Sequence, residues 1–225
     1  MKDFVFQDIL FEFEEVSSTN TIAKEMILKG EGGRCFAILA KKQTSGRGRL
    51  ARSWSSEANG NIYFTLSFHR SLAGNFGCIM PLFTSFALIE VIGEKARYKW
   101  ANDVLIQGKK VAGILVESVG DFFVVGIGVN VMEAPAETLF PATSLKENGL
   151  FLTPKDIFES FSKNLDLSPD FVRNALKQKF FTRDKISINQ GEFEGIMEDI
   201  TKDGNLILRQ NDGRLKEISF GDVGV

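Results

Sequence analysis

Four apolar runs follow one another closely in the middle of the chain, and their spacing limits the folds available to it. The runs cover residues 98–100, 104–106, 111–119 and 122–131, and tight turns at Gln107-Gly108 and Gly120-Asp121 interrupt them. Turns this short join neighbouring antiparallel strands, because a parallel connection needs a crossover of about a dozen residues or more. The sequence therefore predicts an α+β fold with a mixed, largely antiparallel central sheet.

The segments before these runs predict further strands and a first helix. Residues 9–16 alternate between apolar and acidic side chains, which indicates a half-buried strand, and residues 35–40 and 62–68 are apolar enough for buried strands. Residues 17–20 supply the hydroxyl and amide groups that cap helices, and Gly30 ends the helix that follows. The helix is expected to flank the sheet.

Three more helices are predicted, over residues 81–93, 154–165 and 169–181, each with a proline near its start. The chain has 21 phenylalanines against two tyrosines and two tryptophans, which indicates core filling. Six phenylalanines in or beside the last two helices are expected in the core: Phe151, Phe158, Phe161, Phe171, Phe180 and Phe181.

After about residue 182 the pattern changes to four short β-runs. They cover residues 185–188, 192–200, 206–209 and 215–218, with Asp-Gly turns between the later ones. Regular short strands with turn signals are typical of a small barrel. Two domains are therefore predicted, at residues 1–182 and 183–225.

Composition excludes several classes of protein. The net charge of -2 argues against a surface built for nonspecific nucleic-acid binding. Cys35 and Cys78 lie far apart without metal-ligand spacing, which argues against a zinc site or a disulfide framework. No stretch approaches the length of apolar sequence that crosses a membrane, and the N-terminus is not a signal segment, so a cytoplasmic protein is expected.

The segment from Lys41 to Asn61 is a long polar loop, and loops of this length in compact domains are usually functional. Between Lys41 and Arg52 it carries five cations and no acid, and Gly46 and Gly48 lie on either side of Arg47. Glycine lets backbone N–H groups approach an anion, and arginine makes charge-assisted hydrogen bonds to phosphate or carboxylate. We expect an anion site that orders when a ligand binds, although a solvated basic loop that touches RNA or nothing would have the same composition.

Two later segments carry further candidate chemistry. Lys99 is followed by Trp100, an amide and a carboxylate, and a lysine there could neutralise charge that develops in a reaction, or could be an ordinary surface lysine. In the runs 110–117 and 125–130 glycine interrupts apolar sequence, which weakens a strand unless something approaches its backbone. Two core strands with a bulge would also explain the glycines.

In combination, these segments resemble the biotin protein ligase family. The family pattern is Ser-Thr-Asn, Gly-Arg-Gly-Arg-x-Gly-Arg-x-Trp, Lys-Trp-Pro-Asn-Asp, Lys-x-Ala-Gly-Ile-Leu-x-Glu and Gly-x-Gly-x-Asn. This chain has all five in order, at residues 18–20, 46–54, 99–103, 110–117 and 126–130. There are two departures, Ala51 in place of glycine and Ala101 in place of proline. The resemblance implies a class II synthetase-like catalytic domain followed by a small SH3-like β-barrel.

The resemblance also implies a two-step reaction. Biotin and ATP, with Mg²⁺, would form biotinyl-AMP and pyrophosphate, and the biotin would then pass to a lysine of a biotin carboxyl carrier protein domain of acetyl-CoA carboxylase. Lys99 and Arg47 would be catalytic. The residues expected at biotin are Ser18, Thr19, Asn20, Gln43, Arg47, Gly48, Arg49, Lys99 and Gly113, and those expected at ATP are Arg47, Arg49, Trp54, Lys99, Asn102, Lys110 and Asn130. Asp103 could assist the metal or the acceptor lysine, or could cap a turn locally.

Two alternative functions and the oligomeric state stay open at this point. A lipoate or octanoate ligase shares the general fold and acyl-adenylate chemistry, and an RNA- or DNA-binding module would use the basic loop without ATP chemistry. The catalytic pattern begins within the first twenty residues, so no DNA-binding domain and no repressor function are expected. An exposed sheet edge could pair two subunits into a homodimer or be covered within one chain.

Overall fold

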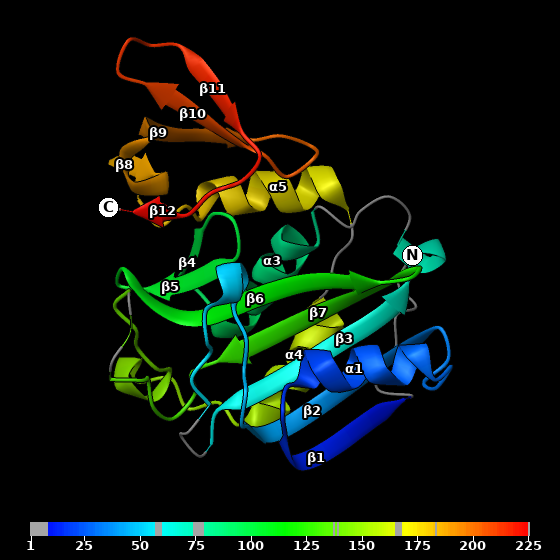
Figure 1. Ribbon diagram of the computed structural model, residues 1–225. Coiled ribbons are helices and arrows are strands. Elements are labelled where there is room, and N and C mark those ends of the chain that lie inside the picture. The colour runs from blue at the N-terminus through cyan, green and yellow to red at the C-terminus, as the bar shows by residue number, and fades with distance from the viewer. Residues whose placement is uncertain are drawn as a thin grey trace.

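The main sheet has seven strands in the order β1-β2-β3-β7-β6-β5-β4 (Figure 1). The structure, a computed structural model, describes residues 9–56, 60–73, 79–136, 138, 140–164, 168–182 and 184–224. Only β1 and β2 pair in parallel, and the five other pairings within this sheet are antiparallel. The predicted mixed, largely antiparallel sheet is therefore confirmed. Its strands are β1 (Leu10–Val16), β2 (Cys35–Gln43), β3 (Ile62–His69), β4 (Ala96–Lys99), β5 (Asp103–Ile106), β6 (Lys109–Val119) and β7 (Phe122–Val129).

Tight turns join β5 to β6 and β6 to β7. Gln107 and Gly108, between β5 and β6, both have positive φ, at 50° and 76°, as a two-residue type I′ turn requires. Gly120, between β6 and β7, has φ 53°. Both predicted turns are confirmed, and they hold β5, β6 and β7 side by side.

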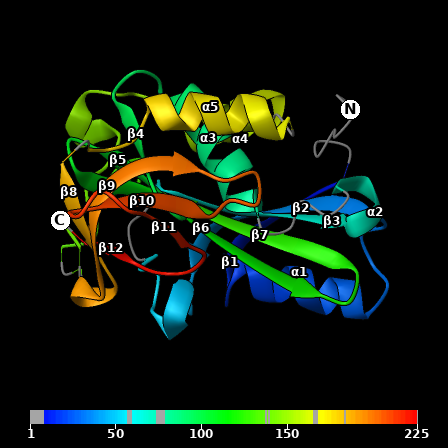
Figure 2. The ribbon, with the colours of Figure 1, turned by 90° about the horizontal axis from the view of Figure 1, so that it is seen from above.

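Helices cover both faces of the sheet (Figures 1 and 2). Helix α1 (Thr19–Leu28) packs on β2, β3, β6 and β7, whereas α3 (Met80–Ile92) packs on the opposite face together with α4 (Pro154–Asn164) and α5 (Pro169–Gln178). A short helix that the sequence did not predict, α2 (Arg70–Ala73), follows β3. Single 3₁₀ turns lie at Arg49–Ala51, Lys146–Asn148 and Asn189–Gly191.

Helix α5 ends three residues earlier than predicted. Phe180 forms a parallel bridge with Tyr98, in which the Tyr98 N–H donates to the Lys179 carbonyl at 2.7 Å and the Phe181 N–H donates to the Tyr98 carbonyl at 2.9 Å. These bonds require extended backbone, so the helix stops at Gln178 and the chain pairs with β4 instead.

The core is divided by the sheet into two layers. Under α1 the buried cluster is small: Ala23, Met26, Phe36, Ile38 and Val124. The opposite face carries the larger cluster, in which the ring of Phe64 meets Phe158 at 5.4 Å and Phe161 at 5.3 Å.

The prediction that all six phenylalanines near the last helices are buried was wrong for two of them. Phe151 is 83% exposed because it lies before α4 begins, outside the helical pattern. Phe171 is 56% exposed because α5 buries Val172 and Leu176, and a neighbouring position points about 100° away around the helix. Phe171 still meets the edge of Phe86, at 5.5 Å between ring centroids.

A second, five-stranded antiparallel sheet follows α5, in the order β11-β10-β9-β8-β12. It lies beside α5 and the turn between β4 and β5 (Figure 1), where the Trp100 Nε1–H donates to the Gly204 carbonyl at 2.9 Å and Lys177 pairs with Asp199 at 3.0 Å. The predicted boundary at residues 182 and 183 stays a prediction. The strands are β8 (Lys185–Ile188), β9 (Phe193–Ile200), β10 (Leu206–Gln210), β11 (Leu215–Ile218) and the unpredicted β12 (Val223–Gly224).

Within the described residues, no helix has both the length and the apolar character needed to cross a membrane.

The packing of α1 on β7 generates a stability prediction. A Cβ added at Gly126 would lie 2.3 Å from Oδ1 of Asn20, which is buried and hydrogen-bonded. Gly126→Ala is therefore expected to lower the free energy of unfolding by about 1 to 3 kcal/mol, measured by urea denaturation. In Gly224→Ala the nearest atom would be 3.8 Å away, and the change should stay within about 0.5 kcal/mol. Equal changes in the two variants would contradict this account of the packing.

Candidate active site

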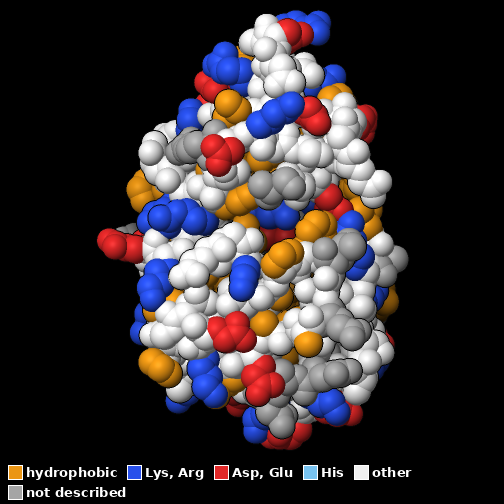
Figure 3. Space-filling view, turned by 90° about the vertical axis from the view of Figure 1, so that its left-hand side faces the viewer, with side chains coloured by type: hydrophobic (Ala, Val, Ile, Leu, Met, Phe, Trp, Pro, Cys, Tyr) orange, Lys and Arg blue, Asp and Glu red, His pale blue; other side chains and the backbone are white. Residues whose placement is uncertain are grey.

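A cavity of about 920 Å³, including its open mouth, lies between the main sheet and residues Asp222 and Val223 at the start of β12. It opens on the face of the main sheet on which α1 packs, which is the pocket face. The space-filling view shows a hollow near the middle of one face with basic and acidic side chains in it (Figure 3). Thirteen of the fourteen residues singled out from the sequence, Asp103 included, line the cavity: Ser18, Thr19, Asn20, Gln43, Arg47, Gly48, Arg49, Trp54, Lys99, Asn102, Asp103, Lys110 and Gly113. Segments that are far apart in the chain therefore meet in one place.

The Gly-Arg segment forms a small hairpin over the cavity. The Trp54 N–H donates to the Gly46 carbonyl at 2.9 Å, and the Gly48 N–H donates to the Arg52 carbonyl at 2.7 Å. A Cβ at Gly46 would lie 2.5 Å from the Trp54 carbonyl oxygen, so this position requires glycine. The two hydrogen bonds bring Arg47, Arg49 and Arg52 together on one small hairpin that lines the cavity.

One of the two departures from the family motif, Ala51, fits the local backbone. The left-handed conformation at the tip of the hairpin falls on Leu50, with φ 54°, and not on Ala51, which therefore does not need the freedom of glycine. Ala101 follows Trp100 through a cis peptide bond, and its carbonyl accepts a hydrogen bond of 3.0 Å from the Tyr98 hydroxyl.

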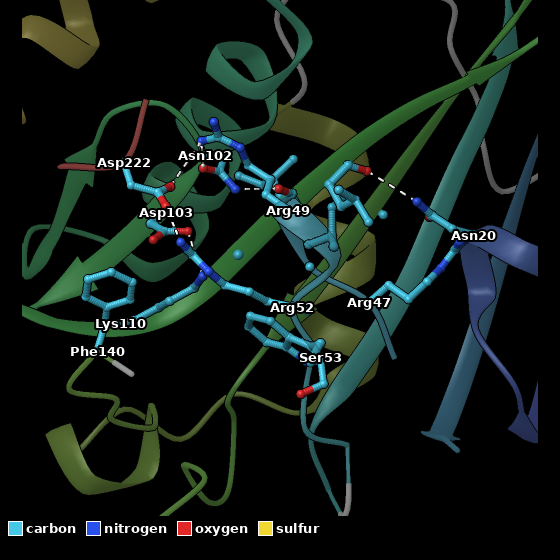
Figure 4. A pocket seen from close by; sticks show the side chains of 18 of the residues that line it. Asn20, Arg47, Arg49, Arg52, Ser53, Asn102, Asp103, Lys110, Phe140 and Asp222 are labelled. Atoms are coloured by element: carbon cyan, nitrogen blue, oxygen red, sulfur yellow. Dashed lines mark hydrogen bonds and ion pairs between the residues drawn. The ribbon is translucent and has the colours of Figure 1, made fainter. Parts of the chain in front are cut away.

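One end of the cavity is polar but mostly uncharged. Ser18, Thr19 and Asn20 are each at least 96% buried at the start of α1. The Thr19 N–H and hydroxyl donate to Oε1 of Gln43 at 2.8 and 3.2 Å, which fixes the Gln43 amide with its nitrogen toward Ser56. In the close view, Asn20 and Arg47 lie together at this end (Figure 4).

The floor of the cavity is bare backbone covered by an indole ring. A Cβ at Gly113 would lie 2.7 Å from the Trp54 ring, and a Cβ at Gly128 would lie 2.5 Å from it. The interrupting glycines of β6 and β7 therefore do admit a close approach, as the sequence suggested. The buried Trp54 Nε1–H has no hydrogen-bond partner among the described residues, so it is available as a donor.

The other end of the cavity is cationic. Apart from Arg47 at the polar end, the described residues that line the cavity include four cations, Arg49, Arg52, Lys99 and Lys110, and two carboxylates, Asp103 and Asp222, which leaves two positive charges in excess. Because the whole chain has a net charge of -2, this positive charge is local. Such a site attracts anions.

Lys99 lies at the end of β4 and is 92% buried. Its ammonium sits 4.5 Å from the centre of the Phe140 ring and makes no salt bridge with the residues that the structure describes. Burial lowers the pKa of Lys99 below its ordinary value, with Lys110 acting in the same direction and Asp103 opposing it. An anionic ligand would relieve this destabilisation of the charged form.

Two aspartates hold Lys110 and Arg52. Lys110 pairs with Asp103 at 2.7 Å and lies 5.2 Å from the centre of the Trp54 ring. Arg52 contacts Asp222 through Nη2, and Arg49 donates to the Asn102 side chain at 2.9 Å and to the Gly221 carbonyl at 3.3 Å. Figure 4 shows Asp222, Asn102, Asp103, Lys110 and Phe140 grouped at this end.

Asn130 is the one predicted site residue that does not line the cavity. Its side chain is buried and its amide nitrogen donates to the Thr143 carbonyl at 3.1 Å, so it fixes the loop that follows β7. The structure instead adds Arg52, Phe140 and Asp222 to the cavity. Arg52 stands within the Gly-Arg motif and could have been chosen, whereas nothing around Phe140 or Asp222 in the sequence marks them.

The described residues contain no cluster of three or more histidines, cysteines or carboxylates that could hold a metal alone. Mg²⁺ commonly binds one or two carboxylates together with substrate phosphates. Asp103, whose side chain is 15% exposed inside the cavity, offers one such carboxylate. The site therefore fits a metal that arrives with a phosphate ligand.

Comparison with known proteins agrees with this geometry. Residues 12–131 match the Biotin/lipoate A/B protein ligase family and residues 185–224 match the Biotin protein ligase C terminal domain. The chain is 28% identical to the biotin--[acetyl-CoA-carboxylase] ligase of Mycobacterium tuberculosis (94% of this chain and 88% of that one) and 32% identical to that of Paracoccus denitrificans (91% and 97%).

Among solved structures, the biotin protein ligase of Aquifex aeolicus in complex with biotin and ATP superposes with a TM-score of 0.80, at 29% identity over 96% of this chain and 97% of that one. With its family match over more than half of its length, the chain belongs to the biotin protein ligases of the Biotin/lipoate A/B protein ligase family.

Proposed function

We propose that the protein activates biotin with ATP and transfers it to a lysine of a biotin carboxyl carrier protein domain of acetyl-CoA carboxylase, in the cytoplasm, where ATP is available. The observation that carries the proposal is a single cavity with an uncharged polar end and a cationic end. Biotin has a neutral cyclic urea at one end and a carboxylate at the other, and ATP brings further negative charge. The cavity therefore matches both substrates in one orientation.

In that orientation the urea of biotin lies among Ser18, Thr19, Asn20 and Gln43, and its carboxylate points toward Lys99. Trp54 covers the glycine floor of β6 and β7, and in this proposal it moves to stack on adenine, which leaves that floor to the bicyclic ring of biotin. Gly48, Arg47 and Arg49 close over the carboxylate and the phosphates from the hairpin.

The first step joins the two substrates. A biotin carboxylate oxygen attacks the α-phosphorus of ATP, the bond from that phosphorus to the bridging oxygen breaks, and pyrophosphate leaves. Negative charge increases on the phosphate oxygens and the leaving group, and Lys99, Lys110 and Arg52 lie at this end of the cavity. Preorganised cations of this kind lower a barrier because they need not reorient during the reaction.

Magnesium would accompany ATP, held largely by phosphate oxygens with Asp103 as the protein carboxylate, and would neutralise phosphate charge. In the second step the neutral amine of the acceptor lysine attacks the carbonyl carbon of the adenylate. The bond from that carbon to the AMP oxygen breaks, and the amine loses a proton as the amide forms.

The deciding experiment is pyrophosphate release with ATP and Mg²⁺, with biotin, lipoate and octanoate offered separately and the adenylate identified by mass. Turnover with biotin alone is expected. Turnover with lipoate or octanoate would move the assignment to the sister activity, and no turnover together with salt-sensitive RNA or DNA binding would replace it by a binding module.

Lys99→Ala tests the catalytic assignment. Adenylate formation should fall by about 100-fold or more in single-turnover assays, while the dissociation constant of biotin changes much less, because the charge that Lys99 meets develops mainly in the transition state. Lys109, which is exposed and adjoins the cavity residue Lys110 in the chain, gives the matched control Lys109→Ala. Equal losses in binding and rate at Lys99 would rule this role out.

Arg47→Ala tests closure of the hairpin. Release of biotinyl-AMP should become about tenfold faster, because a charge-assisted hydrogen bond to the bound intermediate is lost. The measurement is the release rate of preformed adenylate after dilution. Lys41→Ala, in which a 75% exposed side chain on β2 is removed, should leave the rate unchanged, and an unchanged rate in Arg47→Ala would refute the role.

A further inference from the structure

Glu117 lies on β6 just outside the lining of the cavity, and three side chains converge on its carboxylate. Lys24 contacts Oε1 at 2.9 Å, whereas the Asn20 Nδ2 and Arg47 Nη2 atoms contact Oε2 at 2.8 and 3.3 Å. Asn20 and Lys24 are four residues apart on α1 and so share one helix face. One carboxylate thus connects the start of α1, the centre of the sheet and the hairpin.

The contacts around Asn20 fix which way its amide points. Oδ1 accepts a hydrogen bond of 2.7 Å from the Thr65 hydroxyl, and Nδ2 donates to Glu117 and, at 3.3 Å, to the Leu115 carbonyl. A flipped amide would place its oxygen against two acceptors, the carboxylate and the carbonyl. Since an amide oxygen has two lone pairs, the observed orientation leaves one further acceptor position on Oδ1, which lies beside Gly126 of the cavity lining.

Glu117 is suited to this role only while it is ionised, because an ionised carboxylate accepts hydrogen bonds and donates none. Burial alone would raise the pKa of Glu117, but hydrogen bonds from Lys24 and Asn20 and the charges of Lys24 and Arg47 outweigh burial and lower it. The carboxylate is therefore charged at neutral pH.

We propose that Glu117 is a positioning residue for the urea end of biotin, acting through Asn20. By holding Nδ2 of Asn20, it turns Oδ1 toward the cavity as an acceptor for an N–H of a cyclic urea. The assignment rests on the proposed function, since the urea is the group recognised.

The test compares the dissociation constant of biotin, the KM for ATP and kcat in Glu117→Ala. Loss of one hydrogen bond that orients a buried amide should raise the dissociation constant of biotin by about tenfold. The KM for ATP should change by less than about twofold and kcat by less than about threefold. In Glu117→Gln the side-chain oxygen can still accept from Asn20, so its effect should be smaller than that of Glu117→Ala.

A double-mutant cycle separates positioning from general support of the fold. If Glu117 acts through Asn20, adding Glu117→Ala to Asn20→Ala should change the dissociation constant of biotin by less than about twofold. As a matched control, Glu198→Ala removes an ion-paired glutamate on the second sheet, 2.7 Å from Arg209, and should leave biotin binding unchanged.

Three results would overturn the assignment: full additivity of the two alanine substitutions, a parallel rise in the KM for ATP, or Glu117→Gln as weak in biotin binding as Glu117→Ala. If the wild-type protein binds biotin and forms its adenylate while Glu117→Ala binds equally well, only the role of Glu117 fails. If the wild-type protein neither binds nor activates biotin, the proposed function fails and this role with it.

Discussion

The centre of the main sheet has to be buried on both faces and still leave room for a ligand on one of them. Strand β3 is buried along almost its whole length, with Phe64 and Leu66 toward α3 and α4 and Thr65 toward α1. Its neighbour β7, and β6 on the other side of β7, meet the same demand with Gly126, Gly128 and Gly113 on the pocket face, where side chains from elsewhere touch the backbone. The apolar layer on one side supplies the burial that holds the strands together, and the bare backbone on the other side makes the cavity possible.

This division explains what could be predicted from the sequence. Short turns, alternation and apolar runs depend on neighbouring residues, so the strands of both sheets other than β12, the turn at Gln107 and Gly108 and the start of α1 followed from local pattern. Features that depend on distant contacts did not. The end of α5 is set by pairing of Phe180 with Tyr98, and the two-residue strand β12 exists only through its pairing with β8.

The same distinction applies to the cavity. Motif residues such as Lys99, Trp54 and Arg49 could be located because their neighbours in the chain form recognisable patterns, and they do line one cavity, although their roles remain predictions. Asn130 also lies in a motif, yet its amide is used by the loop that carries Thr143. Phe140 and Asp222 reach the cavity from loops without any pattern, where only the folded chain brings them near.

The contact of Asp222 and Gly221 with the arginines of the hairpin has a consequence for how the molecule acquires its site. The cavity joins residues near position 18 to residues 222 and 223, and closing a loop across so large a sequence separation costs conformational entropy. A ligand that occupies the cavity touches groups from both sheets, and binding to the native state alone stabilises it by mass action. Substrate binding would therefore stabilise the packing of the second sheet against the main sheet. At the junction formed by Trp100, Gly204 and Asp222, folding of the second sheet and binding in the cavity are thermodynamically coupled.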